Sequence, residues 1–191
     1  KMKHPLDFIP DRVRRPLFLA LLVWTVGLFA VLQALNRPLI TDAAPNGIVS
    51  FELARTPEKA REVLASWEPQ SNPPLGFLLI KPYHVAFGLG LDYLFMPAYA
   101  IAIALGVLLA MRRHKGWFAS LGAWLGWGSL AAALFDAVEN YALFRVLLGE
   151  GFRYSAAAAA SATIKFGLIL PGLAYALVGA LLPKSGKQAE K

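Results

Sequence analysis

Four long apolar stretches constrain the fold of this chain more than any other feature of its sequence. They cover about residues 16–36, 83–111, 117–148 and 156–182. A helix needs about 20 apolar residues to cross a hydrocarbon layer of roughly 30 Å, so each stretch is long enough to span a membrane. Because a backbone in lipid must satisfy its own hydrogen bonds, we predict an all-α integral membrane protein, a four-helix bundle forming one domain.

The composition agrees with lipid as the main solvent. Of 191 residues, 57% are hydrophobic and 16% are charged, whereas soluble domains have about a quarter of their residues charged. The chain has no cysteine, which excludes disulfides, thiolate metal sites and thiol catalysis. The remaining metal alternative is a hard ion held by carboxylate oxygens. We expect neither a metal nor a cofactor.

Basic residues are distributed unevenly between the two sides of the predicted bundle. The chain has 19 Lys and Arg against 12 Asp and Glu, a net charge of +7. Eleven of the 19 basic residues lie before the first span, between the second and third spans, or after the fourth. The positive-inside rule then predicts a multi-pass membrane protein with both termini in the cytoplasm. Topology explains the charge, so we expect no nucleic-acid partner.

The largest segment outside the spans, residues 37–82, contains a predicted amphipathic helix. The sequence Thr56-Pro57-Glu58 has residue types favoured at an N-cap, a first helical position and a first turn. Apolar residues then recur at the spacing of one helical face, at Ala60, Val63, Leu64 and Trp67. We predict a helix at about residues 57–67 that lies on the outer membrane surface or caps the bundle.

Ionisable residues occur at one depth in three of the predicted spans. Counting about 20 residues back from each cytoplasmic end reaches the neighbourhood of Asp92, Asp136 and Lys165. Glu139 and Asn140 follow Asp136 at positions i+3 and i+4 and share its helical face. We therefore expect these side chains to converge near the outer interface.

Such a cluster indicates a functional site, because a charge in a membrane is costly unless it pairs, faces a cavity or reaches water. Either some of the acids keep a proton, which suits proton transfer, or the site holds a cation or an amine. Asp136 and Asp92 are the candidate catalytic acid and base. The candidate ligand-binding residues are Glu139, Asn140, Lys165, Glu52, Arg55 and Tyr93.

Other conspicuous residues suggest architecture. Gly122 and Gly126 have a spacing that allows the third span to approach a neighbour closely. His4 and His114 lie outside the spans and show no chemistry in the sequence.

Three functions from different classes fit this pattern. The site could bind, and process by proton transfer, a lipid-like or amphipathic small molecule. The chain could instead be a proton- or cation-coupled transporter, which with four spans requires a homo-oligomer, or a structural subunit of a membrane complex. The cytoplasmic halves of the last three spans offer few polar side chains, mainly Ser129 and Tyr175, which disfavours a continuous transport pathway. Whether the protein is an enzyme stays open.

Four short segments carry a resemblance to known proteins. They are FELA at residues 51–54, LDYLF at 91–95, DAVEN at 136–140 and KF at 165–166. Together they resemble a group of uncharacterised bacterial four-span membrane proteins over about residues 50–165. The resemblance supports grouping these residues and implies no activity.

The chain is also similar in general plan to the sterol isomerase and sigma-2 receptor family, because both have four helices with intramembrane acids. This second likeness is an analogy of architecture.

Overall fold

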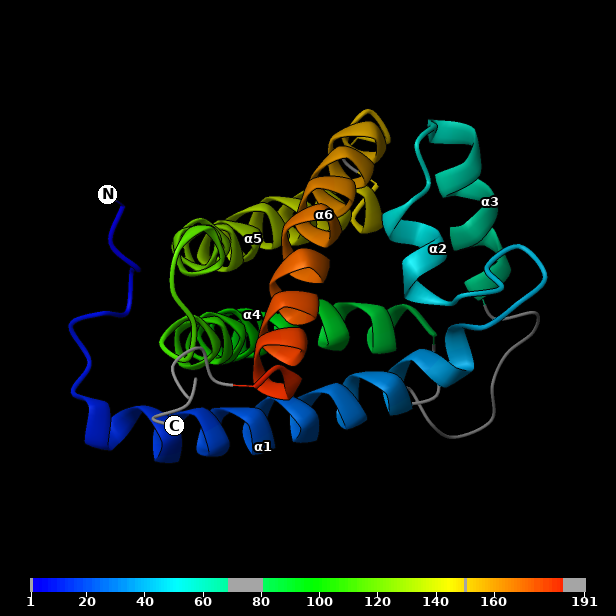
Figure 1. The fold of residues 1–191 in the computed structure, drawn as a ribbon. Coiled ribbons are helices and arrows are strands. Elements are labelled where there is room, and N and C mark those ends of the chain that lie inside the picture. Colours follow the sequence, from blue (N-terminus) through cyan, green and yellow to red (C-terminus); the bar gives the residue numbers. More distant parts are fainter. Residues whose placement is uncertain (1, 69–80, 150, 184–191) are drawn as a thin grey trace, which may run out of the picture. The chain divides into compact units, whose positions relative to one another are not determined.

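The computed structural model describes residues 2–68, 81–149 and 151–183. In chain order the elements are α1 (Asp11–Asn36), a short 3₁₀ helix η1 (Arg37–Leu39), α2 (Ile48–Glu52), α3 (Pro57–Trp67), α4 (Lys81–Met111), α5 (Trp117–Leu147) and α6 (Tyr154–Leu181) (Figure 1). These ranges contain no strand, and the all-α fold class predicted from the sequence is confirmed. Residues 69–80, in the predicted outer loop, lie outside the described residues.

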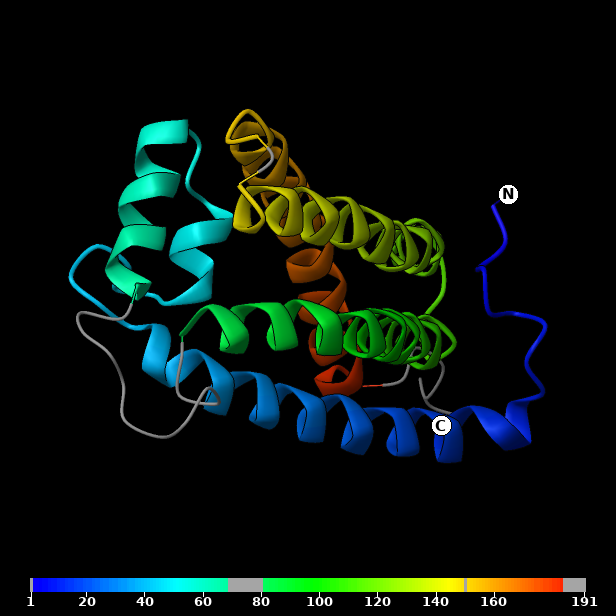
Figure 2. The same ribbon diagram turned by 180° about the vertical axis from the view of Figure 1, so that it is seen from behind.

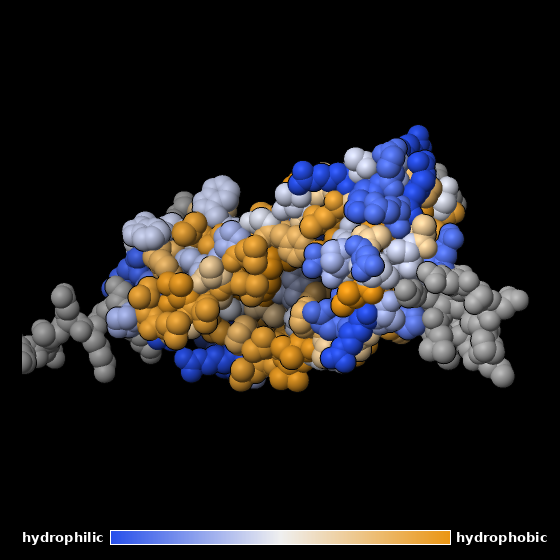
Figure 3. All heavy atoms as spheres, turned by 90° about the vertical axis from the view of Figure 1, so that its right-hand side faces the viewer, coloured by the Kyte–Doolittle hydropathy of each residue, from blue (hydrophilic) through white to orange (hydrophobic). Residues whose placement is uncertain are grey.

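Four helices, α1, α4, α5 and α6, are long and apolar enough to cross a membrane. Large apolar side chains are exposed along them, including Val23 (73% exposed) on α1 and Leu134 (71% exposed) on α5. Figure 3 shows hydrophobic residues gathered over a broad area of the visible face. Such apolar surfaces are rare on soluble monomers, so lipid is the solvent that suits them. Helix α1 begins at Asp11, before the predicted span at about residues 16–36. The helix therefore also includes the basic residues that precede the apolar stretch.

Two compact units make up the chain, and each of the four long helices contributes a segment to both. Unit 1 comprises Lys1–Thr25, Pro97–Ala133 and Lys165–Lys191. Unit 2 comprises Val26–Met96 and Leu134–Ile164. Unit 1 therefore contains both chain ends and the α4–α5 turn, whereas unit 2 contains α2, α3 and the α5–α6 turn.

Glycines permit close helix contacts in unit 1. A Cβ atom on Gly122 would lie 2.6 Å from the Tyr175 hydroxyl, and one on Gly179 would lie 2.7 Å from the Cβ of Ala110. Helix α6 therefore approaches both α5 and α4 at positions without side chains. The Tyr175 hydroxyl donates to the Phe118 carbonyl at 2.8 Å, and the two rings stack with centroids 4.3 Å apart. Gly122 thus accommodates an aromatic side chain of the neighbouring helix.

Within unit 1, the residues before α1 pack against α5 through a buried histidine. The His4 side chain is 3% exposed, and its ring occupies the space that a Cβ on Gly126 would take. The His4 Nδ1 atom accepts a hydrogen bond from the Leu6 amide at 3.2 Å. The Lys3 carbonyl accepts one from Trp127 Nε1 at 3.1 Å. Gly126 therefore makes room for an imidazole, and His4 has a packing role that its sequence position does not indicate.

Asp7 connects this N-terminal segment to two helices. Its carboxylate accepts a hydrogen bond from Arg112, just after α4, at 2.6 Å and lies 3.8 Å from Arg14 of α1. Arg14 also pairs with Asp11 and donates to the carbonyl of Ile9 at 2.8 Å. The hydrogen bond from Arg112 holds the pKa of Asp7 below its usual value, because the guanidinium favours the ionised carboxylate.

Helices α2 and α3 lie side by side in unit 2, as Figure 2 shows. Helix α3 has the N-cap expected from the sequence, since Thr56 Oγ1 accepts a hydrogen bond from the Lys59 amide at 3.3 Å. The buried residues of α3 are Ala60, Val63 and Trp67. They belong to a core that also includes Val85 and Leu89 of α4, Leu143 and Val146 of α5, and Ala158 of α6. Helix α3 therefore shares a core with α4, α5 and α6 within unit 2.

Trp67 fixes α3 to the other short elements of unit 2. Its side chain is 1% exposed, and its Nε1 atom donates to the Leu39 carbonyl of η1 at 2.7 Å. The ring packs edge-on against Phe51 of α2 at a centroid distance of 5.5 Å. At the end of α1, Asn36 Oδ1 accepts a hydrogen bond from the Ile48 amide at 2.7 Å. These contacts order the connection from α1 to α3.

We expect the protein to lose stability between about pH 6.5 and pH 4 because of His4. Burial disfavours the imidazolium and lowers the pKa of His4 to about 4. The unfolded chain binds a proton as the pH falls below about 6.5, whereas the folded protein binds it near pH 4, so the free energy of unfolding should fall by roughly 2 kcal/mol across this window. Thermal unfolding in detergent at pH 7.5 and pH 4.5 measures the effect. In His4→Phe, which cannot titrate, this part of the pH dependence should disappear; an unchanged pH dependence would contradict the assignment.

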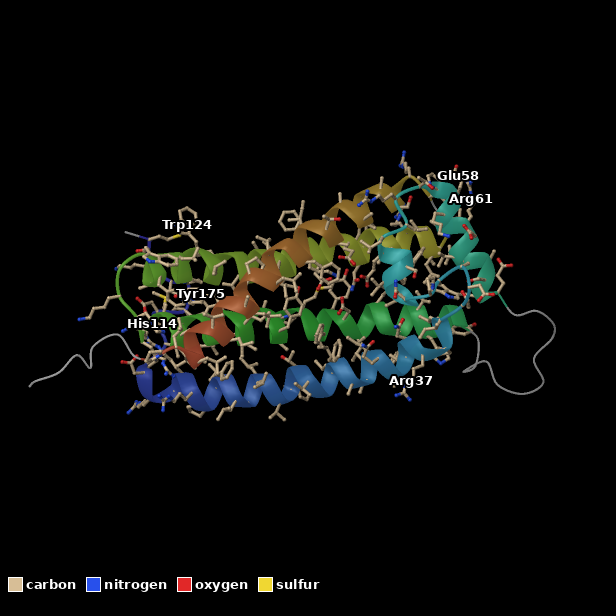
Figure 4. All side chains as sticks on the ribbon, turned by 45° about the vertical axis from the view of Figure 1, so that its right-hand side comes forward. Arg37, Glu58, Arg61, His114, Trp124 and Tyr175 are labelled. Atoms are coloured by element: carbon tan, nitrogen blue, oxygen red, sulfur yellow. The ribbon has the colours of Figure 1, made fainter. Side chains whose placement is uncertain are left out.

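Replacing Trp67 should destabilise unit 2, and the loss of unfolding free energy should be larger for Trp67→Ala than for Trp67→Phe. Trp67→Phe keeps a ring but removes the hydrogen bond to the Leu39 carbonyl, which should cost about 1–3 kcal/mol. Trp67→Ala also leaves a cavity, which should raise the loss to about 3–5 kcal/mol. Trp124, which is 62% exposed on α5 (Figure 4), supplies the control. Trp124→Phe should change the unfolding free energy by less than about 0.5 kcal/mol, and an equal loss in both Phe variants would refute the role given to Trp67.

Candidate functional site

Three polar side chains are buried on one face of α5. Asp136 is 2% exposed, Glu139 is fully buried and Asn140 is 3% exposed. Their spacing of three and four residues places them one turn apart on the same side of the helix. The helix is one of the four candidate membrane spans. Two carboxyl groups are therefore buried within one turn of each other in an otherwise apolar span.

Asn140 joins this face of α5 to α4. Its Nδ2 atom donates to the Leu89 carbonyl at 3.1 Å and to Asp92 Oδ2 at 2.9 Å. A carboxamide nitrogen has two donors, and here both are used on the same neighbouring helix. The second bond fixes the Asp92 carboxyl group against α5. The structure thus brings together Asp92 and Asn140, which the sequence placed in one cluster.

The electrostatics of this cluster are set by three acids in unit 2. Asp136 and Glu139 lie on the same helical face, and Asp92 is hydrogen-bonded to Asn140 on that face. Like charges one helical turn apart repel each other, and burial increases the cost. Acids at such positions are therefore the basis for a functional hypothesis.

The other predicted site residues lie on α2, α4 and α6 and in the link from α2 to α3. Glu52 is the last residue of α2 and is half-buried, whereas Arg55 is exposed in the link to α3. Tyr93 of α4 is 49% exposed. Lys165 of α6 is 6% exposed, has its Nζ atom 4.8 Å from the centre of the Phe166 ring, and belongs to unit 1.

Two buried serines of α6 were not among the predicted site residues. Ser155 is 2% exposed and donates to the Phe152 carbonyl at 2.7 Å, and Ser161 is 7% exposed. Ser161 follows Ala158, a core residue of unit 2, by one helical turn. The sequence did contain this signal, because a serine that shares a face with core alanines is itself expected to be buried.

Metal binding receives no support from the residues that the structure describes. Within that part of the chain, no group of three or more His, Cys, Asp or Glu side chains is arranged to hold an ion.

The contact between Asp92 and Asn140 should be measurable as a coupling energy. In a double-mutant cycle, Asp92→Ala and Asn140→Ala remove the two partners of the 2.9 Å hydrogen bond singly and together. We expect the two losses in unfolding free energy to be non-additive by roughly 0.5–3 kcal/mol. Thr163, whose hydroxyl donates within α6 to the Ala159 carbonyl, provides a reference cycle. The losses in unfolding free energy caused by Asp92→Ala and Thr163→Ala should add to within about 0.5 kcal/mol. Similar coupling energies in both cycles would argue against the contact.

No protein-family model, curated protein or solved structure matches this chain. What the protein does must therefore be inferred from the chemistry of its own side chains. The relevant group is the pair of acids buried on α5 together with Asp92, which Asn140 holds from the same face.

Proposed function

We propose that this protein binds a lipid-like or amphipathic small molecule in the membrane, with the acids of unit 2 holding the polar head of that molecule. The observation that carries this proposal is the burial of Asp136, Glu139 and Asn140 on one face of a candidate span. We also propose that the chain lies in the bacterial inner membrane with both termini in the cytoplasm. The positive-inside rule supports this orientation, because eleven of the 19 basic residues lie in segments on one side of the predicted spans.

The chemistry of the head group follows from the residues that would contact it. Carboxyl groups buried in an apolar span favour a partner that offers positive charge or N–H and O–H donors. An amine or a hydroxylated head group meets this requirement. The rest of an amphipathic molecule would lie among the apolar side chains that make up most of the spans. A wholly apolar ligand would offer the acids neither charge nor a hydrogen bond.

Proton transfer is the reaction that this group of residues supports. Asp136 and Glu139 are one turn apart on the buried face of α5, so a head group bound there would meet two carboxyl groups. Asp92 is fixed by Asn140, whose side chain bonds to two oxygens of α4. We assign Asp136 and Asp92 as the candidate acid and base, with Glu139 and Asn140 as binding residues.

Transport is less well supported because Ser129 and Tyr175, the polar residues named above for the cytoplasmic halves of the last three spans, are used internally. The Ser129 hydroxyl donates to the Leu125 carbonyl at 2.9 Å, one turn earlier in α5. The Tyr175 hydroxyl donates to the Phe118 carbonyl at 2.8 Å. Both groups therefore satisfy backbone oxygens, which leaves them poorly suited to lining a proton or cation path.

Mass spectrometry of small molecules carried by the purified protein tests the proposal. We expect a specific amphipathic species to be enriched on the wild type and to be at least about tenfold depleted on Asp136→Asn, because the neutral amide loses about 1.4 kcal/mol or more of interaction with a charged head. Glu68→Gln, at an exposed acid of unit 2, is the matched control and should carry the species at the wild-type level.

The helical content and the thermal midpoint of both variants are measured in the same detergent. If Asp136→Asn is folded and carries the same molecules as the wild type, the ligand-binding proposal is wrong. If Asp136→Asn unfolds while Glu68→Gln does not, the acids serve helix packing, and the structural-subunit alternative is favoured.

A further inference from the structure

The segment before α1, residues 2–9, covers apolar parts of unit 1. Its His4 side chain is 3% exposed and its Leu6 side chain is 8% exposed. The His4 ring takes the space that a Cβ atom on Gly126 of α5 would occupy. Leu6 belongs to a buried apolar cluster with Leu105 and Leu108 of α4. Detachment of this segment would therefore uncover surfaces of both α4 and α5.

The His4 ring also determines the fold of the segment itself. Its Nδ1 atom accepts a hydrogen bond at 3.2 Å from the Leu6 amide, two residues later in the chain. The Asp7 amide then donates to the His4 carbonyl at 3.1 Å, and the Ile9 amide donates to the Leu6 carbonyl at 3.1 Å. Asn and Asp side chains close turns in the same way, by accepting from a backbone amide two residues on. The imidazole thus closes a turn as an acceptor.

Protonation of His4 is incompatible with this geometry. A ring nitrogen that accepts a hydrogen bond carries no hydrogen, so the neutral ring has its proton on Nε2. A second proton goes to Nδ1, and the resulting imidazolium has two donors and no acceptor. Its Nδ1–H would face the N–H of Leu6 at a buried position. The packed segment therefore requires a neutral ring, whereas in a detached segment water accepts from both nitrogens.

Charged groups face His4 from its own segment, from α1 and from the end of α4. They are Asp7, Arg14 and Arg112. Burial is the largest effect and lowers the pKa of His4 to about 4, while the carboxylate favours protonation and the two guanidinium groups oppose it. From α4 and α5 the ring meets the uncharged Ala104 backbone, which favours the imidazolium, and Gly126. Asp11, which pairs with Arg14, has a side chain that is 79% exposed.

Asp7 does not change its charge in the same pH range. The hydrogen bond from Arg112 holds the pKa of Asp7 below its ordinary value, so this carboxylate remains ionised at pH 5. The two arginines are charged at every pH considered. Between pH 7.5 and pH 5, His4 is therefore the group of this cluster whose protonation depends on whether the segment is packed or detached.

We propose that residues 2–9 form a pH-sensitive latch, which is closed on α4 and α5 while His4 is neutral and is released when His4 binds a proton. Release uncovers Gly126 and the side chains of α4 that Leu6 covers. The latch precedes the apolar stretch that begins at about residue 16, so water has access to the released histidine. This device is independent of the acids of unit 2 and of the ligand proposed for them.

Hydrogen exchange, measured by mass spectrometry on the full chain in nanodiscs, tests the latch. The readout is the protection factor of peptides within residues 2–9, corrected with an unstructured peptide of the same sequence, under conditions where closing is faster than exchange. The pKa of His4 is about 4 in the closed latch and about 6.5 in a detached segment. Protection should therefore fall by about 30-fold between pH 7.5 and pH 5.

His4→Asn separates the hydrogen bond from the titration. An Asn side chain has an oxygen that accepts from the Leu6 amide, and it binds no proton, so the protection factor should not depend on pH. His114→Asn is the matched control, because His114 is another histidine of unit 1, in the turn between α4 and α5 (Figure 4). This control should keep the 30-fold fall. Circular dichroism checks that each variant is folded.

Two results would overturn the proposal. One is the same pH-dependent loss of protection in His4→Asn as in the wild type. The other is equal protection of residues 2–9 and of buried α5 amides at each pH, because the segment would then detach only when unit 1 unfolds. If the segment of His4→Asn is already unprotected at pH 7.5, His4→Phe keeps a ring beside Gly126 without titrating, and a wild-type pH dependence in that variant would equally rule out the latch.

Discussion

Lipid provides no hydrogen bonds to a polypeptide, and the structure of this protein depends on that constraint. The backbone of each long apolar stretch is therefore helical, and few polar side chains remain to be placed. Those that do occur in the spans have identifiable partners in several cases. Ser129 and Tyr175 of unit 1 donate to backbone carbonyls. In unit 2, Asn140 donates to a carbonyl and a carboxyl group of α4.

The acids of unit 2 are buried under the same constraint. Asn140 links Asp92 of α4 to α5, and Asp136 and Glu139 are two further buried acids on the same face of α5. Acids at such positions are costly in an apolar span unless their surroundings stabilise them, and for this reason the proposed binding site is assigned to them.

Charge is arranged differently at the water-facing parts of the two units. In unit 1, Asp7 connects Arg14 and Arg112, so the N-terminal segment is held by compensated charges. In unit 2, Arg145 and Arg153 share the ring of Tyr154. Compensated pairs hold a segment in place, and a guanidinium over a ring face is held by the negative charge of the π system.

The amino-acid sequence was enough to predict the long helices, the short α3 with its Thr56 cap, and the helical face shared by Asp136 and Asn140. Each of these follows from apolar length or from a spacing within one helix, which local physics sets. The sequence also placed Asp92 and Asn140 at one depth, but their hydrogen bond, and the position of His4 beside Gly126, are known only from the tertiary structure. Contacts of this kind join residues far apart in the chain, and they depend on how the helices are rotated and how closely they approach, which no local pattern encodes.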